Sequence, residues 1–411
     1  MRATRDSHMS LEFHKLLMNQ LGVRQMMGVL HWLWRGSACV VVIWLGTGVQ
    51  ATAGEQPSGD AVDLSAQVPT DPLAKMVDEA VNISIRRYLS ANVHTPWQIM
   101  HGLLALRKDY LIKEQGKKVS AIEWLSSGVT YHGTPWFEKT QHGGRAHPFS
   151  VPYAFEGHPN QFLAILAMSG LPMDHEIKAG DQTITIADIV QHAKAEVTSS
   201  REVAWTLWAF SHYLGSEARW KNKYGESWSI ERLVRKQINE PVSRAACGGT
   251  HGLFALTYAR NVSLQTRKPL RGVWLEADHK IKRYIETARS NQNRDGTFST
   301  SYFQGRGYSH SFETRLSSSG HTLEFLMLAL PQSRLREQWA RNGVAAVARD
   351  LIDHRREPAK CAPLYHAVDA LVIYRDRTNP KPKASQDHEV ATKETAADSH
   401  DATDTRNPGT N

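Results

Sequence analysis

Histidine recurs at the same position of four apolar segments of this 411-residue chain. The segments read His101-Gly-Leu-Leu-Ala-Leu, His251-Gly-Leu-Phe-Ala-Leu, His321-Thr-Leu-Glu-Phe-Leu and His366-Ala-Val-Asp-Ala-Leu, and two similar ones begin at Gln161 and Trp205. Imidazole titrates near neutral pH, so it acts as a general acid or base, and it also binds metals. Four imidazoles at equivalent positions therefore mark a candidate site, although each could instead cap a helix or bond a neighbouring carbonyl.

The densest group of reactive side chains surrounds His321. It comprises a phenol, imidazoles, guanidiniums and a carboxylate between Gln292 and Glu324. A phenol or imidazole could act as general acid or base while a guanidinium holds a carboxylate. This mixture suits β-elimination from a uronic-acid sugar, and the expected catalytic residues are His321, Tyr308, His310, Arg315 and Glu324. The alternative is a loop held onto the domain by its own polar groups.

A pair of carboxylates for glycoside hydrolysis is the competing arrangement. The candidates are Glu156, Glu202, Glu313, Glu324 and Asp369. Glu202 follows Arg201 at a predicted helix start, where capping or an ion pair also explains it. Glu324 and Asp369 each follow a histidine by three residues, and an acid in an apolar helix is costly unless it is paired. Both are therefore expected to face a cavity or an ion-pair partner.

Further residues are expected to bind substrate at the polar end of the histidine segments. The helices that begin there would gather their positive dipole ends and free N–H groups around one mouth, which favours an anionic group. The expected substrate-binding residues are Trp97, His101, Gln161, Trp205, His251, Arg306, His366 and Asp369.

Cys247 and Cys361 are the two cysteines that would remain after removal of a signal peptide. A disulfide or two buried thiols is the favoured interpretation in an oxidising compartment. The alternative is a metal site that uses both thiolates with His251 or His366. The sequence has no P-loop, dinucleotide fingerprint, nucleophile elbow or H-E-x-x-H helix. No metal and no cofactor are therefore expected.

The histidine segments alternate with amphipathic ones. Nearly all-apolar helices are predicted at 97–107, 160–169, 201–214, 248–259, 319–330 and 364–374, and amphipathic helices at 72–90, 119–126, 184–197, 228–239, 273–291 and 335–353. An all-apolar helix is buried on every side. Six helices of each kind predict an all-α (α/α)6 toroid of inner and outer helices, with a helical solenoid as the alternative. Two long insertions, at 127–156 and 292–318, interrupt the pattern, and the first could hold a β-hairpin.

The two ends of the chain differ from the middle. An apolar run at 36–50, followed by Ala51-Thr-Ala53, predicts a signal peptide over residues 1–53 that is cleaved near Ala53. The protein would then be secreted or periplasmic, with a single-pass membrane anchor through 36–50 as the alternative. A linker is expected at 54–69, the toroid domain at 70–376 and a disordered tail at 377–411, because the tail has almost no large apolar residues.

The formal net charge of +8 is mild for this length, and the basic residues are scattered. No run of Lys and Arg interleaves with aromatic residues, so nucleic acid is not an expected partner. An acidic polysaccharide is compatible with the charge. The sequence does not indicate an oligomeric state.

The segment Gln292-x-x-Asp295-Gly296-x-Phe298, at the end of a predicted outer helix, resembles the QW repeat of the terpenoid cyclase and protein prenyltransferase toroids. Phe298 stands where that repeat has Trp, and the D-x-D-D motif of cyclases is missing. Pro363-Leu-Tyr-His366 is loosely similar to the zinc-histidine segment of prenyltransferases, and Cys247-Gly-Gly-Thr-His251 to a segment of the lanthionine cyclases. The region 70–376 also resembles secreted toroid proteins of bacteria such as planctomycetes. The resemblance implies the toroid fold and carries no catalytic residue across.

Two functions are expected from these observations. The first is a carbohydrate-active enzyme, a polysaccharide lyase or glycoside hydrolase, that works at the histidine-rich mouth. The alternative is a non-catalytic toroid that acts as a binding or scaffold protein. A cavity lined by tryptophan and by catalytic side chains would favour the enzyme, and a cavity filled by its own side chains would favour the scaffold.

Overall fold

The computed structural model describes residues 71–148 and 153–379. The predicted signal peptide or anchor, the linker and most of the predicted tail lie outside this part of the chain. Within it, no helix is both long and apolar enough to span a membrane.

The described chain is mainly helical, with twelve α-helices, and each one overlaps a segment predicted from the hydrophobic pattern. The apolar segments form α2 (Pro96–Leu106), α4 (Gln161–Met168), α6 (Ala204–Leu214), α8 (Thr250–Gln265), α10 (Phe312–Ala329) and α12 (Cys361–Thr378). The amphipathic segments form α1 (Pro72–Ile85), α3 (Ala121–Ser126), α5 (Ile186–Glu196), α7 (Ile230–Asn239), α9 (Val273–Ser290) and α11 (Gln338–Asp353). The helical class is therefore confirmed.

Five two-stranded antiparallel hairpins accompany the helices in the described residues. Two of them, β3–β4 (Thr130–Tyr131, Thr134–Pro135) and β5–β6 (Phe137–Thr140, Gly143–Ala146), occupy the first predicted insertion. The other three were not predicted: β1–β2 (Leu111–Glu114, Lys117–Ser120), β7–β8 (Glu176–Ala179, Gln182–Thr185) and β9–β10 (Arg219–Lys221, Ser227–Ser229). Each of these three leads directly into an amphipathic helix, and its last residue accepts a hydrogen bond as the N-cap of that helix: Ser120, Thr185 and Ser229.

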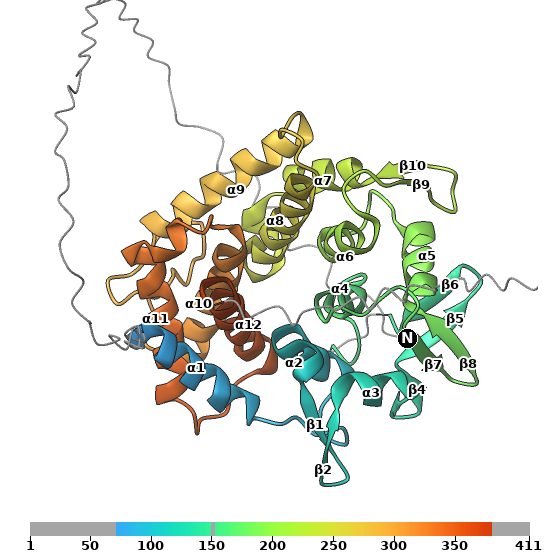
Figure 1. The fold of residues 1–411 in the computed structure, drawn as a ribbon, viewed down its shortest axis with the longest axis horizontal. Helices are drawn as coiled ribbons and strands as arrows, with labels where there is room; N and C mark the ends of the chain where they lie inside the picture. Colours follow the sequence, from blue (N-terminus) through green and yellow to red (C-terminus); the bar gives the residue numbers. More distant parts are fainter. Residues whose placement is uncertain (1–70, 149–152, 380–411) are drawn as a thin grey trace, which may run out of the picture. The chain divides into compact units, whose positions relative to one another are not determined.

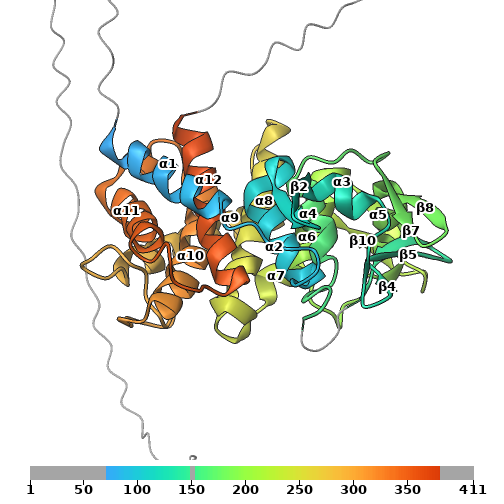
Figure 2. The same cartoon turned by 90° about the horizontal axis from the view of Figure 1, so that it is seen from below.

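The six apolar helices contact one another in a closed series. Contacts run from α2 through α4, α6, α8 and α10 to α12, and α12 packs back on α2. The amphipathic helices pack against this series from outside, with α1 on α12, α9 on α8 and α11 on α10 (Figure 1). The hairpins β5–β6 and β7–β8 lie beside α5, at the end away from α1 and α11 (Figure 2).

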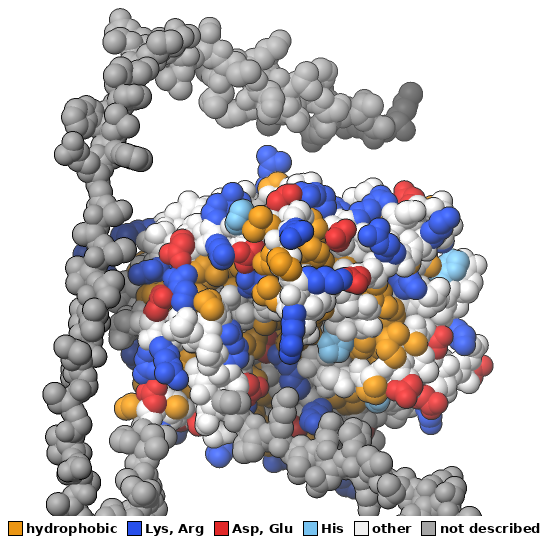
Figure 3. Space-filling view, turned by 45° about the horizontal axis from the view of Figure 1, so that its top comes forward, with side chains coloured by type: hydrophobic (Ala, Val, Ile, Leu, Met, Phe, Trp, Pro, Cys, Tyr) orange, Lys and Arg blue, Asp and Glu red, His pale blue; other side chains and the backbone are white. Residues whose placement is uncertain are grey.

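Basic side chains are spread over the visible face in Figure 3, among acidic and apolar ones. They form no continuous basic stripe on this face, which agrees with the scattered basic residues of the sequence.

Helices α10 and α12 pack tightly against each other in the histidine region. A Cβ atom added to Gly320 would lie 2.8 Å from the Ala367 Cβ and 3.0 Å from its Cα and N atoms. These are backbone and near-backbone atoms that cannot rotate away. His321 follows Gly320 on α10, and His366 precedes Ala367 on α12. The glycine therefore allows these two histidines to come together.

We expect Gly320→Ala to destabilise the protein by about 1–3 kcal/mol, because the new methyl group must push α10 and α12 apart. Urea unfolding followed by circular dichroism would measure the change. In a helix without this contact, Gly→Ala would stabilise by about 1 kcal/mol. An increase in the free energy of unfolding would thus show that the two helices are not in close contact.

Candidate functional site

The four repeated histidines meet in the interior of the closed helix series. The ring centroid of His366 lies 4.0 Å from that of His321, 5.1 Å from that of His251 and 5.5 Å from that of His101. The four residues are between 1% and 9% exposed. The histidine repeat therefore becomes a single buried cluster, which we call the histidine cluster.

Helix starts were expected at the histidines, but three of the four lie inside their helices. Helices α2, α10 and α12 begin at Pro96, Phe312 and Cys361, so His101, His321 and His366 lie within them. The idea of an open mouth lined by helix N-termini is wrong for these three, and only His251 lies in the first turn of its helix. The N–H groups around an imidazole inside a helix are already hydrogen-bonded. The positive dipole end and free N–H groups of a helix N-terminus are therefore not available beside it.

Cys247 joins the cluster from a tight turn before α8. Cys247, Gly248 and Gly249 all have positive φ, at 50°, 63° and 79°. Left-handed backbone is costly for a residue with a Cβ atom, and such strain is often found at functional sites. The turn brings Cys247 Sγ and one nitrogen each of His251 and His321 within 4.8 Å of one another.

Tyr302 covers this turn from the second insertion. A Cβ atom on Gly248 would lie 2.1 Å from the Tyr302 ring, and one on Gly249 would lie 2.7 Å from the Val242 carbonyl oxygen. Both glycines therefore hold a space that a side chain would fill. Cys247 and Cys361 are both free thiols, and Cys361 is not in the ligand group. The two cysteines do not form a disulfide. The predicted metal site with two thiolates is also wrong, because Cys361 is not part of the ligand group.

Several ring nitrogens of the histidine cluster have no hydrogen-bond partner. The Nδ1 atoms of His101 and His321 lie 2.6 Å and 2.7 Å from the carbonyl oxygens of Trp97 and Ser317. His366 Nδ1 lies 2.8 Å and 2.9 Å from the two carboxyl oxygens of Glu324. In contrast, Nε2 of His321, Nε2 of His366 and both nitrogens of His251 are buried without a partner among the described residues.

These unpartnered nitrogens match what a metal site requires. Burial lowers the pKa of His251 and His321 well below its usual value, and lowers that of His366 to about 3. The imidazoles therefore stay neutral and keep a free lone pair. A metal-bound histidine usually donates its other N–H to a carbonyl or carboxylate, as His321 and His366 are placed to do. The residues present could hold a zinc-like ion through Cys247, His251 and His321.

A buried line of charged groups continues from His366. Glu324 bonds both His366 and Asp369, and Arg107 lies 2.5 Å from the Asp369 carboxylate. Burial raises the pKa of Glu324 to about 8, and burial also raises the pKa of Asp369. Two carboxyl groups in contact share a proton. The two carboxyl groups therefore hold a shared proton, Glu324 accepts the His366 N–H, and Arg107 lies beside Asp369.

A second histidine–acid pair stands on the other side of His251. His158 Nδ1 lies 2.8 Å from Glu202 Oε2, and the His158 ring centroid is 5.4 Å from that of His251. A pocket of about 360 Å³ is lined by Glu202, His251 and Arg244, among others. The pocket reaches the histidine cluster at His251, which is the most exposed of its four members.

The predicted catalytic loop does not join the cluster. Tyr308 and His310 are exposed, and among the described residues neither they nor Arg315 form a hydrogen bond with His321. Arg315 instead binds Asp350 of α11 at 2.8 Å and 3.0 Å and Asp295 at 2.9 Å. These residues therefore fit the alternative, a loop held onto the domain by its own polar groups. The Arg315 guanidinium is already bound to the carboxylates of Asp350 and Asp295.

The expected binding residues divide into two groups. The Trp97 ring packs 4.2 Å from that of His101, and the Trp205 ring 5.1 Å from that of His251, so both tryptophans wall the cluster. Gln161 is buried and accepts a hydrogen bond from the Gly157 N–H. Arg306 is exposed and bonds the Ser290 carbonyl oxygen, away from the cluster.

Three residues of the site were not predicted as part of it: His158, Tyr302 and Arg107. His158 precedes Pro159 and Asn160 in a loop, so no periodic pattern marks it. Arg107 ends α2 with a positive φ of 56°, a conformation that the sequence does not indicate. The adjacent Cys247-Gly-Gly turn was a visible signal for Cys247, since two glycines allow left-handed backbone.

We expect Arg315→Ala to lower the free energy of unfolding by about 3 kcal/mol, because it leaves the buried Asp350 carboxylate without its cation. Chemical denaturation would measure the loss. Arg306→Ala is the matched control and should change stability by less than about 0.5 kcal/mol. A stable Arg315→Ala protein that has lost its activity would instead restore Arg315 to the catalytic group.

Glu324→Gln should make the protein more resistant to alkaline pH. The folded-state pKa of Glu324, about 8, lies above its ordinary value of 4.5, so its contribution to stability is full below 4.5 and lost as the pH rises through 8. Gln keeps the same hydrogen bonds without titrating. The free energy of unfolding would be measured for both proteins at pH 5 and pH 9. The value for the variant should rise relative to that of the wild type between the two. The same difference at both pH values would show that Glu324 is ionised in the folded protein.

Comparisons with protein-family models, with curated proteins and with solved structures found no match. The resemblance to the terpenoid cyclase and prenyltransferase toroids therefore stays a prediction, and the candidate site stands on its geometry.

Proposed function

We propose that the alternating helices form an (α/α)6 toroid, with the six apolar helices as the inner ring. The closed series of contacts from α2 to α12 supports this arrangement. An open solenoid would leave its first and last helices without a common contact. On this proposal the histidine cluster lies within the ring.

We propose further that the protein is a metal-dependent, carbohydrate-active enzyme with its centre at Cys247, His251 and His321. The observation that carries this proposal is the set of buried, unpartnered imidazole nitrogens beside a half-buried thiol. Unpaired polar atoms in a core are destabilising unless something binds them. A thiolate with two imidazoles is a ligand set for zinc or copper rather than for magnesium or calcium.

Zinc would supply a Lewis acid that polarises an oxygen of the substrate or of a bound water. Tetrahedral ligands at zinc distances are roughly 3.5 Å apart, so the three ligand atoms, now within 4.8 Å, need only a small inward shift. Three protein ligands leave one position open. The pocket of about 360 Å³ is lined by one of the three ligands, His251, and we propose it as the route by which substrate approaches.

His158 is the proposed general base. Glu202 accepts its Nδ1–H, which leaves the Nε2 lone pair free to take a proton. The reaction that this supports is β-elimination from a uronic-acid polymer. The C–H proton beside the carboxylate passes to His158, and its electron pair forms a carbon–carbon double bond. The bond to the leaving sugar oxygen breaks, and that oxygen takes a proton from water and leaves as an alcohol. The charged carboxylate would be stabilised at the metal.

A non-catalytic toroid remains the second candidate, and one observation favours it. His101, His321 and His366 are 2% exposed or less, so a metal held there could be purely structural. In that case the metal would stabilise the fold without any turnover. The sequence features of secretion are compatible with either candidate.

The purified protein should contain one zinc or copper ion per chain, which elemental analysis would measure. His251→Ala and His321→Ala should each lower the metal content to near zero, and Cys247→Ser should weaken binding while shifting the absorption of a cobalt-substituted sample. His279→Ala, an exposed histidine of α9, is the control and should retain the metal. Protein that folds and binds no metal at any concentration would contradict the proposal.

Activity would be tested on uronic-acid polymers by the absorbance of the unsaturated product. His158→Ala should abolish turnover with the metal retained, and Tyr308→Phe should leave turnover unchanged. If Tyr308→Phe is inactive and His158→Ala is active, the loop residues catalyse the reaction. Metal without turnover on any substrate would favour the scaffold.

A further inference from the structure

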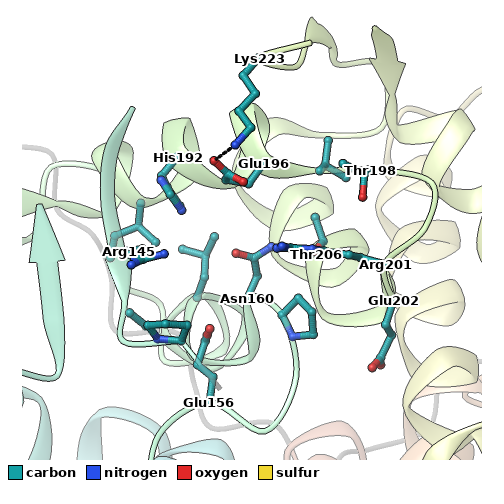
Figure 4. A pocket seen from close by; sticks show the side chains of 16 residues that line it. Arg145, Glu156, Asn160, His192, Glu196, Thr198, Arg201, Glu202, Thr206 and Lys223 are labelled. Atoms are coloured by element: carbon teal, nitrogen blue, oxygen red, sulfur yellow. Dashed lines mark hydrogen bonds and ion pairs between the residues drawn. The ribbon is translucent and has the colours of Figure 1, made fainter. Parts of the chain in front are cut away.

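A second pocket lies next to the one at His251. It has a volume of about 340 Å³, within the range of roughly 300–1,000 Å³ usual for small-ligand sites. Arg201 and Glu202 line both pockets, so they form a common wall between them. The second pocket is set among α4, α5, β6 and the segment before α6 (Figure 4).

The acidic groups of this pocket are already engaged. Glu196 binds Lys223 Nζ at 2.8 Å, and Glu202 binds His158 at 2.8 Å. Glu156 accepts the Phe162 N–H at 2.9 Å, and burial raises its pKa to about 8. The floor of the pocket at Glu156 is therefore largely uncharged at neutral pH.

The guanidinium donors of the pocket are not engaged to the same extent. Arg145 bonds Glu138 through Nε, at 2.7 Å, and makes no other hydrogen bond in the described residues. Arg201 forms no side-chain hydrogen bond or ion pair within the described part of the chain. Figure 4 shows both guanidinium groups extending into the pocket from opposite sides. The unused hydrogen-bonding capacity is thus that of cationic donors.

We propose that this pocket is a subsite for an oxyanion, held between Arg145 and Arg201. Guanidinium groups match carboxylate, sulfate and phosphate oxygens with paired N–H donors. The assignment rests on the proposed function, since Arg201 and Glu202 also border the pocket at His251. A substrate that occupies both pockets carries an acidic group in addition to the one at the metal centre. The preferred substrate is therefore a chain with repeated acidic groups, not a single acidic sugar.

The test is titration calorimetry with three monosaccharide probes on the full-length protein. D-glucuronate carries a carboxylate, glucose 6-phosphate carries a phosphate, and D-glucose carries neither. At least one anionic probe should bind, and glucose should bind at least about tenfold more weakly, as expected for the loss of a charge-assisted pair. The stronger of the two anions identifies whether the subsite suits a carboxylate or a phosphate.

Arg201→Ala and Arg145→Ala should each lower the affinity for the preferred anion by about 10- to 100-fold. Arg201→Lys should keep part of the affinity, because it keeps the charge and loses the paired donors. Arg336→Ala removes an exposed arginine of the short helix Arg334–Arg336 that does not line the pocket, and it should bind as the wild type does. Circular dichroism checks that each variant is folded.

The subsite and the metal centre can fail separately. The same titrations on protein treated with a chelator report the subsite alone, and metal content measured on Arg201→Ala reports the centre alone. Equal binding of glucose and both anions, or no binding of any probe, overturns the subsite. An equal loss of affinity in Arg336→Ala also overturns it, because it would show a general charge effect.

Discussion

The burial of four imidazoles against one another is the constraint on which the rest of this structure depends. A buried polar group must be bonded or it destabilises the fold. His101 and His321 meet this requirement on their own helices, because each Nδ1 lies beside the carbonyl oxygen four residues earlier. His366 meets it through Glu324 on the neighbouring helix. The same bonds orient the rings so that their remaining nitrogens lack protein partners, which is the property expected of ligands.

That arrangement also accounts for the acids in otherwise apolar helices. Glu324 and Asp369 were expected to face either a cavity or an ion-pair partner, and the structure pairs them, with Arg107 as the final member of the line. Glu324 fixes one tautomer of His366 by accepting its N–H, and Asp369 shares a proton with Glu324. Trp97 and Trp205 wall the cluster, and the pocket at His251 is lined by Arg201, Glu202 and the segment before α8. The interior therefore has one closed, hydrogen-bonded side and one side that reaches solvent.

Much of the fold could be predicted from the sequence, because the spacing of apolar residues indicates long helices. All twelve segments form helices, and Asp71 caps α1 directly before Pro72. The hairpin β7–β8 and its two counterparts before α3 and α7 were missed. Their strands have three or four residues with several exposed Lys, Glu and Gln side chains, so they resemble solvated linkers. Only the contact with the following helix, through a capping Ser or Thr, shows them to be regular units.

The sequence by itself determined that four histidines occupy equivalent positions and that their helices are buried, since both follow from local pattern. It could not determine which loop residues would reach them. Tyr308 and Arg315 are nearer to His321 in sequence than Cys247 is, yet Arg315 is held away by Asp350, which lies 35 residues further along on another helix. Cys247 reaches the cluster because three successive residues adopt left-handed backbone. The meeting of side chains depends on long-range ion pairs and on individual backbone angles, and only the tertiary structure decides those.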